Sequence, residues 1–230
     1  MATVLITGTN RGLGLEFVKQ LLQRGDKVIA TCRNASAAQE LMELKNSSRN
    51  LEVFEMDVSK PSSLASFASQ LGDRPIDVFI NNAGVYGPKK SSFGGLKADE
   101  WLGVLNINSV APILLTEYLV NNLREGEQKK IIYITSKMGS VGDNQGGGSH
   151  IYRSSKAALN AAAKSVAVDL LGEGFVVGIV HPGWVRTDMG GPNGLIDTET
   201  SVKGMLDVID NLVPENSGEF VAYDGKSIPW

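Results

Sequence analysis

The chain of 230 residues has a single cysteine, Cys32, and only two histidines, His150 and His181. One cysteine excludes an internal disulfide. One thiol and two histidines far apart in the sequence are too few for a zinc cluster, so we expect no metal site. Cys32 ends the apolar run KVIATC. We therefore predict that it is a buried strand residue rather than a nucleophile.

An excess of charge of one sign is also absent. The net charge is −3, and acidic and basic residues are mixed along the chain. Without a basic stripe, we expect no nucleic-acid partner and no binding to an anionic membrane surface. The first residues, MATVLITG, are typical of a strand and a turn rather than of a signal peptide. No apolar run approaches the ~20 residues needed to span a bilayer. These features favour a cytoplasmic protein with no membrane partner.

The composition indicates one globular domain. Hydrophobic residues make up 42% of the chain and charged residues 20%, which is typical of a folded domain with a sizeable core. No linker, repeat or low-complexity segment interrupts the sequence. We therefore treat 1–230 as a single domain.

Short β-branched runs alternate with segments of helical period. Strands are predicted at 3–8, 27–32, 51–58, 76–84, 129–136, 175–183 and 218–225. Helices are predicted at 15–25, 62–71, 98–123 with an interruption near Pro112, 152–171 and 201–212. A further polar helix is predicted to follow the second strand and to end near Ser47. The strands are apolar on both faces, as in a covered parallel sheet. The alternation predicts an α/β fold: a doubly wound Rossmann-type domain with a seven-stranded parallel sheet and helices on both faces.

A glycine-rich turn, TGTNRGLG (7–14), joins the first strand to the first helix. Glycine adopts positive φ and lets a backbone approach a ligand closely. The following helix N-terminus offers free N–H groups and partial positive charge to an anion. Tight strand–helix packing would also explain glycines here. The position after strand one of a βαβ unit nevertheless favours a dinucleotide site.

The end of the second strand indicates which dinucleotide binds. NAD sites usually carry an acidic residue there for the ribose 2′-OH, but this chain reads ATCRN, with Arg33. Arg11 lies inside the glycine turn. Two guanidinium groups near the ribose favour a 2′-phosphate, so we predict NADP(H) over NAD(H). The alternative is that both arginines point into water.

The stretch IYRSSKAALN places Tyr152 and Lys156 four residues apart. On a helix such positions share one face about 6 Å apart. Taken alone, the pair is compatible with an ordinary surface helix. Beside a nicotinamide cofactor, the phenol would serve as proton donor, and a nearby ammonium is expected to lower its pKa from about 10.

The ordered motifs resemble the short-chain dehydrogenases/reductases. They are TGTNRGLG (7–14), DV (57–58), NNAG (81–84), NINS around Asn108, ITS ending at Ser136, YRSSK (152–156) and PGWVRT (182–187). NRGLG, TCRN and the ending DGKSIPW are most similar to the sniffer-type carbonyl reductases and the C-factor-like proteins of that family.

The resemblance implies a role for individual residues. Asn108, Ser136, Tyr152 and Lys156 would form the catalytic group. The cofactor would lie against Gly8, Asn10, Arg11, Gly12, Leu13, Gly14, Arg33, Asp57, Val58, Asn81, Ala83, Gly84, Tyr152, Lys156, Pro182, Gly183, Val185 and Thr187.

The polar neighbours of these residues are expected to have other roles. Strand alternation points Thr135 away from Ser136, and Asn106 is expected to face away from the site. His150 is expected to be a solvated loop residue, and His181 structural.

The substrate pocket is the least readable part of the sequence. Met138, Trp184 and Met189 are candidates to line it, although each could equally serve core or rim packing. The segment between Ser136 and Tyr152 carries an insertion, DNQGGGSH (143–150), and the loop 187–200 has three glycines typical of a lid.

The resemblance implies an NADPH-dependent carbonyl reductase acting on an aldehyde, ketone or quinone. A dinucleotide-binding signalling protein of C-factor type with little turnover is the alternative. A sugar-nucleotide epimerase or dehydratase is less compatible with this length. A homodimer or homotetramer, packed through the helices at 98–123 and 152–171, is expected by analogy alone.

Overall fold

The computed structural model describes residues 1–89 and 93–230. Over that part of the chain, seven strands form one sheet in the order β3-β2-β1-β4-β5-β6-β7, and every neighbouring pair is parallel. The strands are β1 (Thr3–Thr7), β2 (Lys27–Cys32), β3 (Leu51–Glu55), β4 (Val78–Asn81), β5 (Lys130–Ile134), β6 (Val176–His181) and β7 (Phe220–Ala222). The predicted fold class is confirmed.

Every predicted strand except 27–32 extends past the carboxyl end of the observed strand, and two of these overruns concern the site. The run 51–58 ends as a strand at Glu55, and the run 76–84 ends at Asn81. Residues 56–58 and 82–84 turn out of the sheet instead and line the cleft described below. They mix polar and apolar residues, Met-Asp-Val and Asn-Ala-Gly, and continue directly from the apolar runs, so the sequence pattern did not show where each strand ends.

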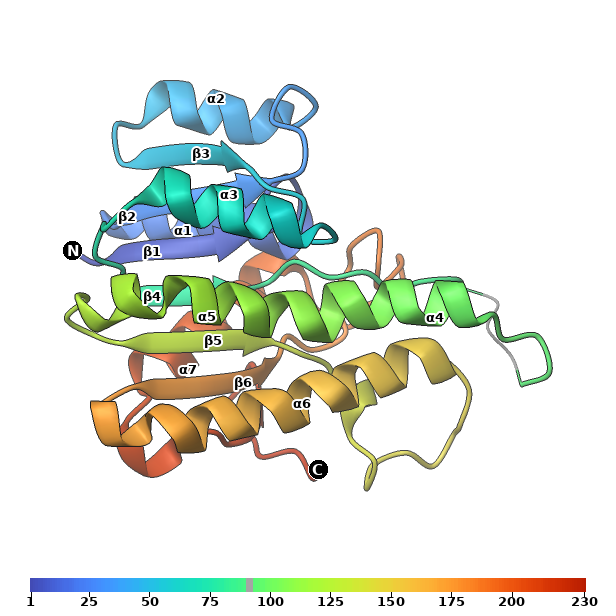
Figure 1. The fold of residues 1–230 in the computed structure, drawn as a ribbon. Helices are drawn as coiled ribbons and strands as arrows, with labels where there is room; N and C mark the ends of the chain where they lie inside the picture. The colour runs from blue at the N-terminus through green and yellow to red at the C-terminus, as the bar shows by residue number, and fades with distance from the viewer. Residues whose placement is uncertain (90–92) are drawn as a thin grey trace.

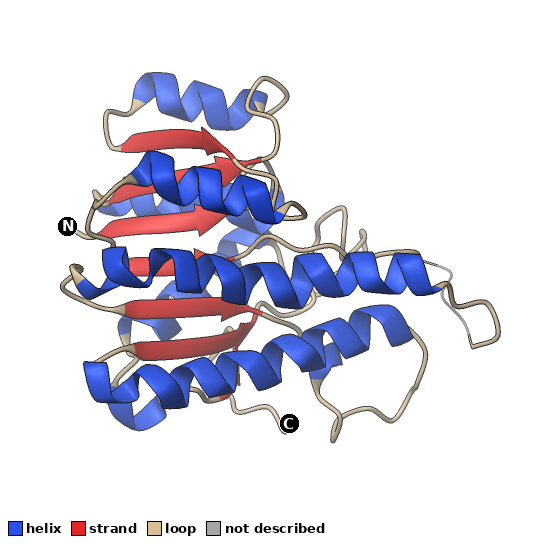
Figure 2. Cartoon of the chain, viewed as in Figure 1, coloured by secondary structure: helices blue, strands red, loops and turns tan. Residues whose placement is uncertain are grey.

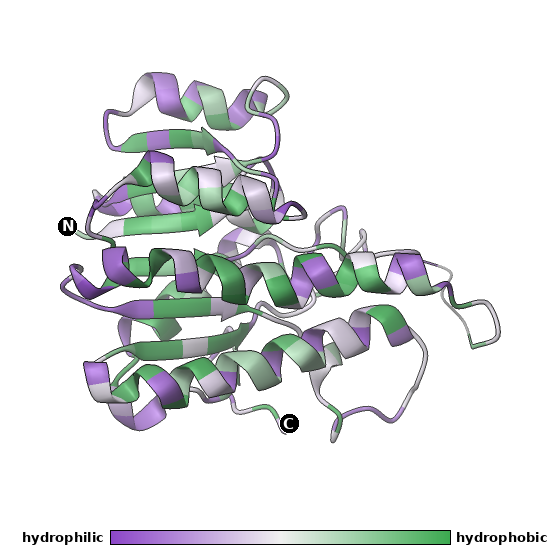
Figure 3. Cartoon of the chain, in the orientation of Figure 1, coloured by the Kyte–Doolittle hydropathy of each residue, from purple (hydrophilic) through white to green (hydrophobic). Residues whose placement is uncertain are grey.

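Helices cover both faces of the sheet (Figure 2). One core packs α1 (Gly12–Arg24), α2 (Gln39–Ser47) and α7 (Thr198–Asp210) on the sheet, and the other packs α3 (Pro61–Leu71), α5 (Ala111–Arg124) and α6 (His150–Leu170) on the opposite face. The strands are apolar, while the polar residues of the helices lie on their outer surfaces (Figure 3). This pattern explains why the strands read as continuous apolar runs.

The helix predicted at 98–123 is not interrupted at Pro112. α4 (Ala98–Leu105) continues through a π-helical turn, Asn106–Val110, into α5, and Pro112 lies in the first turn of α5. The π turn already shifts the hydrogen-bond pattern just before the proline, so the missing proline N–H leaves the helix continuous. The predicted interruption near Pro112 corresponds to this π turn, which breaks the α-helical pattern without ending the helix and carries Asn108.

This continuous helix also corrects the expectation that no apolar segment is long enough to span a bilayer. Among the described residues, Ala98–Arg124 is long and apolar enough to cross a membrane by length and composition, which is weak evidence on its own. In the fold, α5 packs against α3 and α4 packs against α6. Such packing is that of a helix covering a sheet.

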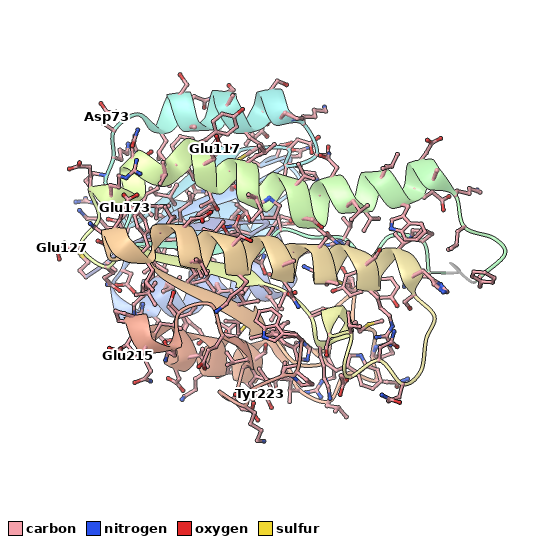
Figure 4. The ribbon with its side chains drawn as sticks, turned by 60° about the horizontal axis from the view of Figure 1, so that its bottom comes forward. Asp73, Glu117, Glu127, Glu173, Glu215 and Tyr223 are labelled. Atoms are coloured by element: carbon pink, nitrogen blue, oxygen red, sulfur yellow. The ribbon has the colours of Figure 1, made fainter. Side chains whose placement is uncertain are left out.

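The strand order places a switch point between β1 and β4. From β1 the chain moves outward to β3 and then returns to β4 on the other side of β1. Ligands of such folds bind at the carboxyl edge of the sheet beside this point. Figure 1 shows α4 and the first turns of α6 extending beyond that edge. Acidic residues such as Glu127, Glu173 and Glu215 lie at the opposite end of the molecule (Figure 4).

Candidate active site

The glycine turn between β1 and α1 is closely packed. Gly8 and Gly12 have positive φ, +71° and +57°. A Cβ on Gly14 would lie 2.2 Å from the Gly8 carbonyl oxygen, so this position accepts only glycine. Asn82 Nδ2 donates to the carbonyl oxygens of Thr7 (2.9 Å) and Gly8 (3.1 Å) and so ties the turn to the end of β4.

The N-terminus of α1 is open to a ligand. Arg11 occupies the N-cap position with extended backbone, and its side chain makes no capping hydrogen bond. The first N–H groups of a helix have no partner within the helix. Together with the helix dipole, these groups suit the anionic diphosphate of a dinucleotide.

A cleft of about 610 Å³ runs from this turn to Tyr152 and Lys156. Most of the predicted cofactor residues line it: Gly8, Asn10, Arg11, Gly12, Leu13, Gly14, Arg33, Asp57, Val58, Ala83, Gly84, Tyr152, Lys156, Pro182 and Thr187. Three do not. Asn81 is buried in β4, Val185 is buried beside Ile196, and Gly183 packs against Tyr223.

The residues present fit a dinucleotide that carries a 2′-phosphate. Arg33 is exposed at the end of β2 and lines the cleft, as the sequence predicted. Arg11 also lines the cleft, but its Nη1 forms a 2.8 Å ion pair with Asp188 in the loop after β6. Both side chains of this pair are mostly exposed, so the pair is weak and can exchange partners.

Tyr152 and Lys156 are both buried on α6, with 7% and 5% of their surface exposed. Burial raises the pKa of Tyr152 to about 12, and a hydrogen bond from Ser136 offsets part of this rise. Burial lowers the pKa of Lys156 to about 8. The Lys156 Nζ donates 2.9 Å to the Ile134 carbonyl oxygen.

These values correct one expectation. The sequence predicted that the ammonium of Lys156 lowers the pKa of Tyr152, but this pKa is raised. The physical reason is that desolvation of the phenolate outweighs the other contributions. The phenol is therefore held in its protonated form across the neutral range.

The two strand-end hydroxyls behave as strand alternation predicted. Ser136 follows β5, lies close to Tyr152 and accepts a hydrogen bond from the Met138 N–H at 3.1 Å. The Thr135 hydroxyl instead donates to Asn160 Oδ1 at 2.6 Å. Thr135 also lines the cleft, whereas Ser136 and Asn108 do not, although Ser136 lies beside Tyr152.

Asn108 is fully buried in the π turn and its side chain is committed to three partners. Oδ1 accepts from the Val85 N–H (2.9 Å), and Nδ2 donates to the Val85 carbonyl oxygen (2.8 Å) and to Ser155 Oγ (3.0 Å). It thereby joins the segment after β4 to α6. Asn106 faces away, as expected, and donates to the Ser59 carbonyl oxygen.

The histidines differ in their surroundings. His181, at the end of β6, is largely buried, and burial lowers its pKa to about 4, consistent with a structural role. His150 is the first residue of α6 and lies 6.0 Å from Phe93, ring centroid to ring centroid. Its Nδ1 is buried, so the expectation of a solvated histidine was wrong.

Of the three candidate substrate residues, only Met189 lines the cleft. Met189 is 46% exposed, and Trp184 is half exposed with its Nε1 donating to the Gly190 carbonyl oxygen. Met138 is partly buried next to Ser136. The inserted segment 143–149 is an exposed loop that leads into α6.

Sequence reasoning missed three contacts of this site. Asn82 anchors the glycine turn, Asp188 pairs with Arg11, and Tyr86 stacks on Tyr152. Asn82 could have been found as the second asparagine of NNAG. Tyr86 and Asp188 lie in irregular loops, where no periodicity indicates direction.

Comparison with known proteins agrees with this geometry. A family model described as short chain dehydrogenase matches residues 2–195. The C-signal of Myxococcus xanthus is 44% identical over 167 residues, which cover 73% of this chain and 100% of that protein. Carbonyl reductase Sniffer of D. melanogaster superposes with a TM-score of 0.95 at 35% identity, covering 100% of both chains. An NADPH-bound carbonyl reductase from chicken fatty liver superposes with a TM-score of 0.94 at 34% identity, covering 100% of this chain and 99% of that one.

Proposed function

The chain belongs to the short chain dehydrogenase family as an NADP-dependent oxidoreductase with a small-molecule substrate, and from this premise we propose that it is a carbonyl reductase. It interconverts aldehydes, ketones or quinones with the corresponding alcohols. One observation carries the proposal: Tyr152 and Lys156 line the same cleft as the glycine turn. The likeness to two carbonyl reductases over the whole chain supports it.

In this proposal Tyr152 donates the proton to the carbonyl oxygen of the substrate. When bound, NADPH supplies the hydride. With its pKa raised to about 12 by burial, the phenol is protonated at neutral pH and ready to donate. The Ser136 hydroxyl hydrogen-bonds the same substrate oxygen and stabilises the charge that develops there. The ammonium of Lys156, one turn along α6, stabilises the tyrosinate and holds the ribose hydroxyls.

The cofactor is held by the residues of the cleft, with NADP(H) preferred over NAD(H). The glycine turn and the N-terminus of α1 receive the diphosphate, and Asp57 and Val58 border the adenine. Arg33 and Arg11 pair with the 2′-phosphate, because two exposed guanidinium groups at this end favour an extra dianionic group. In this proposal Asn81, Gly183 and Val185 support the residues that line the cleft and do not contact the cofactor themselves.

Asn108 is a positioning residue in this account. Its side-chain atoms are all engaged with Val85 and Ser155, so it holds the segment after β4 against α6 and leaves proton transfer to Tyr152 and Lys156. Met138, Trp184 and Met189 form the apolar side of the substrate site, and the loop 187–200 closes over it.

A second candidate function is favoured by the identity to the C-signal of Myxococcus xanthus. In that alternative the fold binds a dinucleotide for signalling and turns over little substrate. The buried Tyr152–Lys156 pair favours the enzyme. Burying the charged group of a lysine costs folding free energy, and a catalytic role for Lys156 explains why the chain bears that cost.

The test is turnover on a carbonyl panel. Purified protein with NADPH and aldehydes, ketones and quinones is expected to oxidise NADPH, followed by the loss of absorbance of the reduced cofactor. The same panel with NADH is expected to be slower. Tight NADPH binding with no turnover on any member would reject the reductase and favour the signalling alternative.

Assembly and location complete the proposal. We expect a homodimer or homotetramer packed through the helices at 98–123 and 152–171, because Leu102, Val110 and Val168 are large apolar residues exposed there. Light scattering coupled to size exclusion decides this.

A cytoplasmic location is proposed because NADPH is a soluble cofactor of that compartment.

A further inference from the structure

Tyr86 lies against the proposed proton donor. It follows the NNAG turn after β4, and its ring stacks on that of Tyr152 with centroids 4.6 Å apart and planes at 26°. Offset stacks of this kind are favourable beyond the area they bury, and they restrict the orientation of both rings. One face of the Tyr152 ring is thus covered by a side chain that does not line the cofactor cleft.

The backbone beside Tyr86 is fixed. The N–H and carbonyl oxygen of Val85 both bond to the Asn108 side chain, at 2.9 and 2.8 Å. Asn108 is fully buried in the π turn. The segment that carries Tyr86 is therefore held against the helix layer, and the ring has a rigid base.

The far end of the Tyr86 side chain is fixed as well. Its hydroxyl lies 2.8 Å from the Ser149 Oγ, at hydrogen-bond distance. Ser149 is the N-cap of α6, and its carbonyl oxygen accepts from the Arg153 N–H at 2.9 Å. Tyr152 lies three residues further on, so Tyr86 contacts both the start of α6 and the reacting side chain.

Ser149 has a backbone conformation that needs support from its surroundings. Ser149 has φ +46°, and Gly147 and Gly148 before it have φ +61° and +64°. A residue with a Cβ is disfavoured in this left-handed region and persists there only when its surroundings impose it. The hydrogen bond between the Tyr86 and Ser149 hydroxyls is such a constraint. It links the inserted segment 143–149 to the first turn of α6.

We propose that Tyr86 is a positioning residue for Tyr152: it clamps the phenol ring by stacking and couples the segment 143–149 to the orientation of the reacting hydroxyl. This inference rests on the proposed role of Tyr152 as proton donor. Small displacements of a reacting group cost large factors in rate, because the near-attack geometry is lost. Loss of the clamp therefore lowers kcat rather than cofactor affinity.

Two substitutions distinguish the contribution of the Tyr86 ring from that of its hydroxyl. Tyr86→Leu removes the stack, while Tyr86→Phe keeps the stack and removes only the hydrogen bond to Ser149. We expect Tyr86→Leu to lower kcat about 10- to 100-fold with the NADPH Kd within about twofold of wild type, and Tyr86→Phe to recover kcat to within about threefold. Tyr118→Leu, the same change at an exposed position of α5, serves as the matched control.

Ring signals give a readout independent of turnover. With ¹³C-labelled tyrosine, the Tyr152 ring signal, assigned through Tyr152→Phe, is expected to shift in Tyr86→Leu and to stay near its wild-type position in Tyr86→Phe. The retained NADPH affinity shows that each variant is folded. If wild type turns over no carbonyl, the proposed function fails, while the ring signals still decide whether the stack exists.

Three outcomes would overturn the inference. A wild-type kcat in Tyr86→Leu shows that the stack has no role in the reaction. Equal losses of kcat in Tyr86→Leu and Tyr86→Phe show that the ring is not the feature used. An unchanged Tyr152 signal in Tyr86→Leu shows that the two rings do not stack in solution.

Discussion

The ammonium of Lys156 donates a hydrogen bond of 2.9 Å to the carbonyl oxygen of Ile134, the last residue of β5. The strand end thereby holds the lysine at the inner end of the cleft. Burial there lowers the pKa of Lys156 to about 8, close enough to physiological pH for its titration to be measured.

The pH dependence of reduction follows from this value. Lys156 is an ammonium below its pKa and neutral above it, so we expect kcat to fall as pH rises through about 8. Tyr152, with its pKa raised to about 12, stays protonated over the same range and adds no fall of its own. The measurement is kcat for NADPH-dependent reduction from about pH 6 to about pH 10. Lys156→Arg keeps the charge and should flatten the profile. A wild-type kcat that is constant to the alkaline limit would count against a required ammonium.

Replacement of Arg33 should change cofactor choice. The side chain is exposed at the end of β2 and lines the cleft. A charge-assisted hydrogen bond to a phosphate contributes about 1.5–3 kcal/mol, so Arg33→Ala is expected to weaken NADPH binding about 10- to 100-fold. NADH binding, measured in the same titration, should change little. A wild type that prefers NADH, or equal losses for both nucleotides, would show that Arg33 does not read the 2′-phosphate.

Asp188 should compete with the cofactor for Arg11. Its carboxylate pairs with Arg11 at 2.8 Å at the edge of the cleft. Asp188→Asn removes this competitor and one negative charge, so we expect tighter NADPH binding, with a larger gain at low ionic strength because the groups are exposed. Asp143→Asn, in the inserted loop, removes a carboxylate that pairs with Lys137 instead and serves as control. Weaker NADPH binding in Asp188→Asn would mean that the pair supports the site rather than competes with it.

Asn108 should matter for stability as well as for rate. Asn108→Ala leaves the Val85 N–H and carbonyl groups without their partners, and an unsatisfied buried polar group costs about 1–3 kcal/mol. We expect a loss of this size in the free energy of unfolding, measured by urea denaturation, together with a lower kcat. Asn106→Ala, on the same π turn but facing Ser59, should cost less on both measures. Equal effects at the two positions would remove the special role given to Asn108.

The seven-stranded parallel sheet with helices on both faces could be predicted because the strands are apolar on both faces and alternate with amphipathic helices. The run LEVFEMDV shows where this reasoning fails, because its last residues, Met56, Asp57 and Val58, line the cleft instead of continuing the strand. The interruption near Pro112 was predicted from the proline, but its form, a π turn inside a continuous helix, could not be, since a π turn has no sequence period that reveals it.

In the candidate site, residues on helices and strands could be predicted from the sequence, whereas residues in loops could not. Gly14, Tyr152 and Lys156 lie on regular elements at fixed spacing, so their juxtaposition follows from the fold. Tyr86 and Asp188 lie in loops, where the direction of a side chain depends on tertiary contacts. The pKa of Tyr152 depends on burial, which the i+4 spacing of the lysine could not give.

The most direct test of the account is Tyr152→Phe, compared with wild type in both NADPH binding and single-turnover reduction of the best carbonyl of the panel. The change removes one hydroxyl and keeps the ring, so NADPH affinity should be unchanged. Loss of a positioned general acid costs about 10²- to 10⁴-fold in rate, and we expect a decrease of that order. A variant that reduces the carbonyl at the wild-type rate would contradict the central claim that this buried phenol is the proton donor.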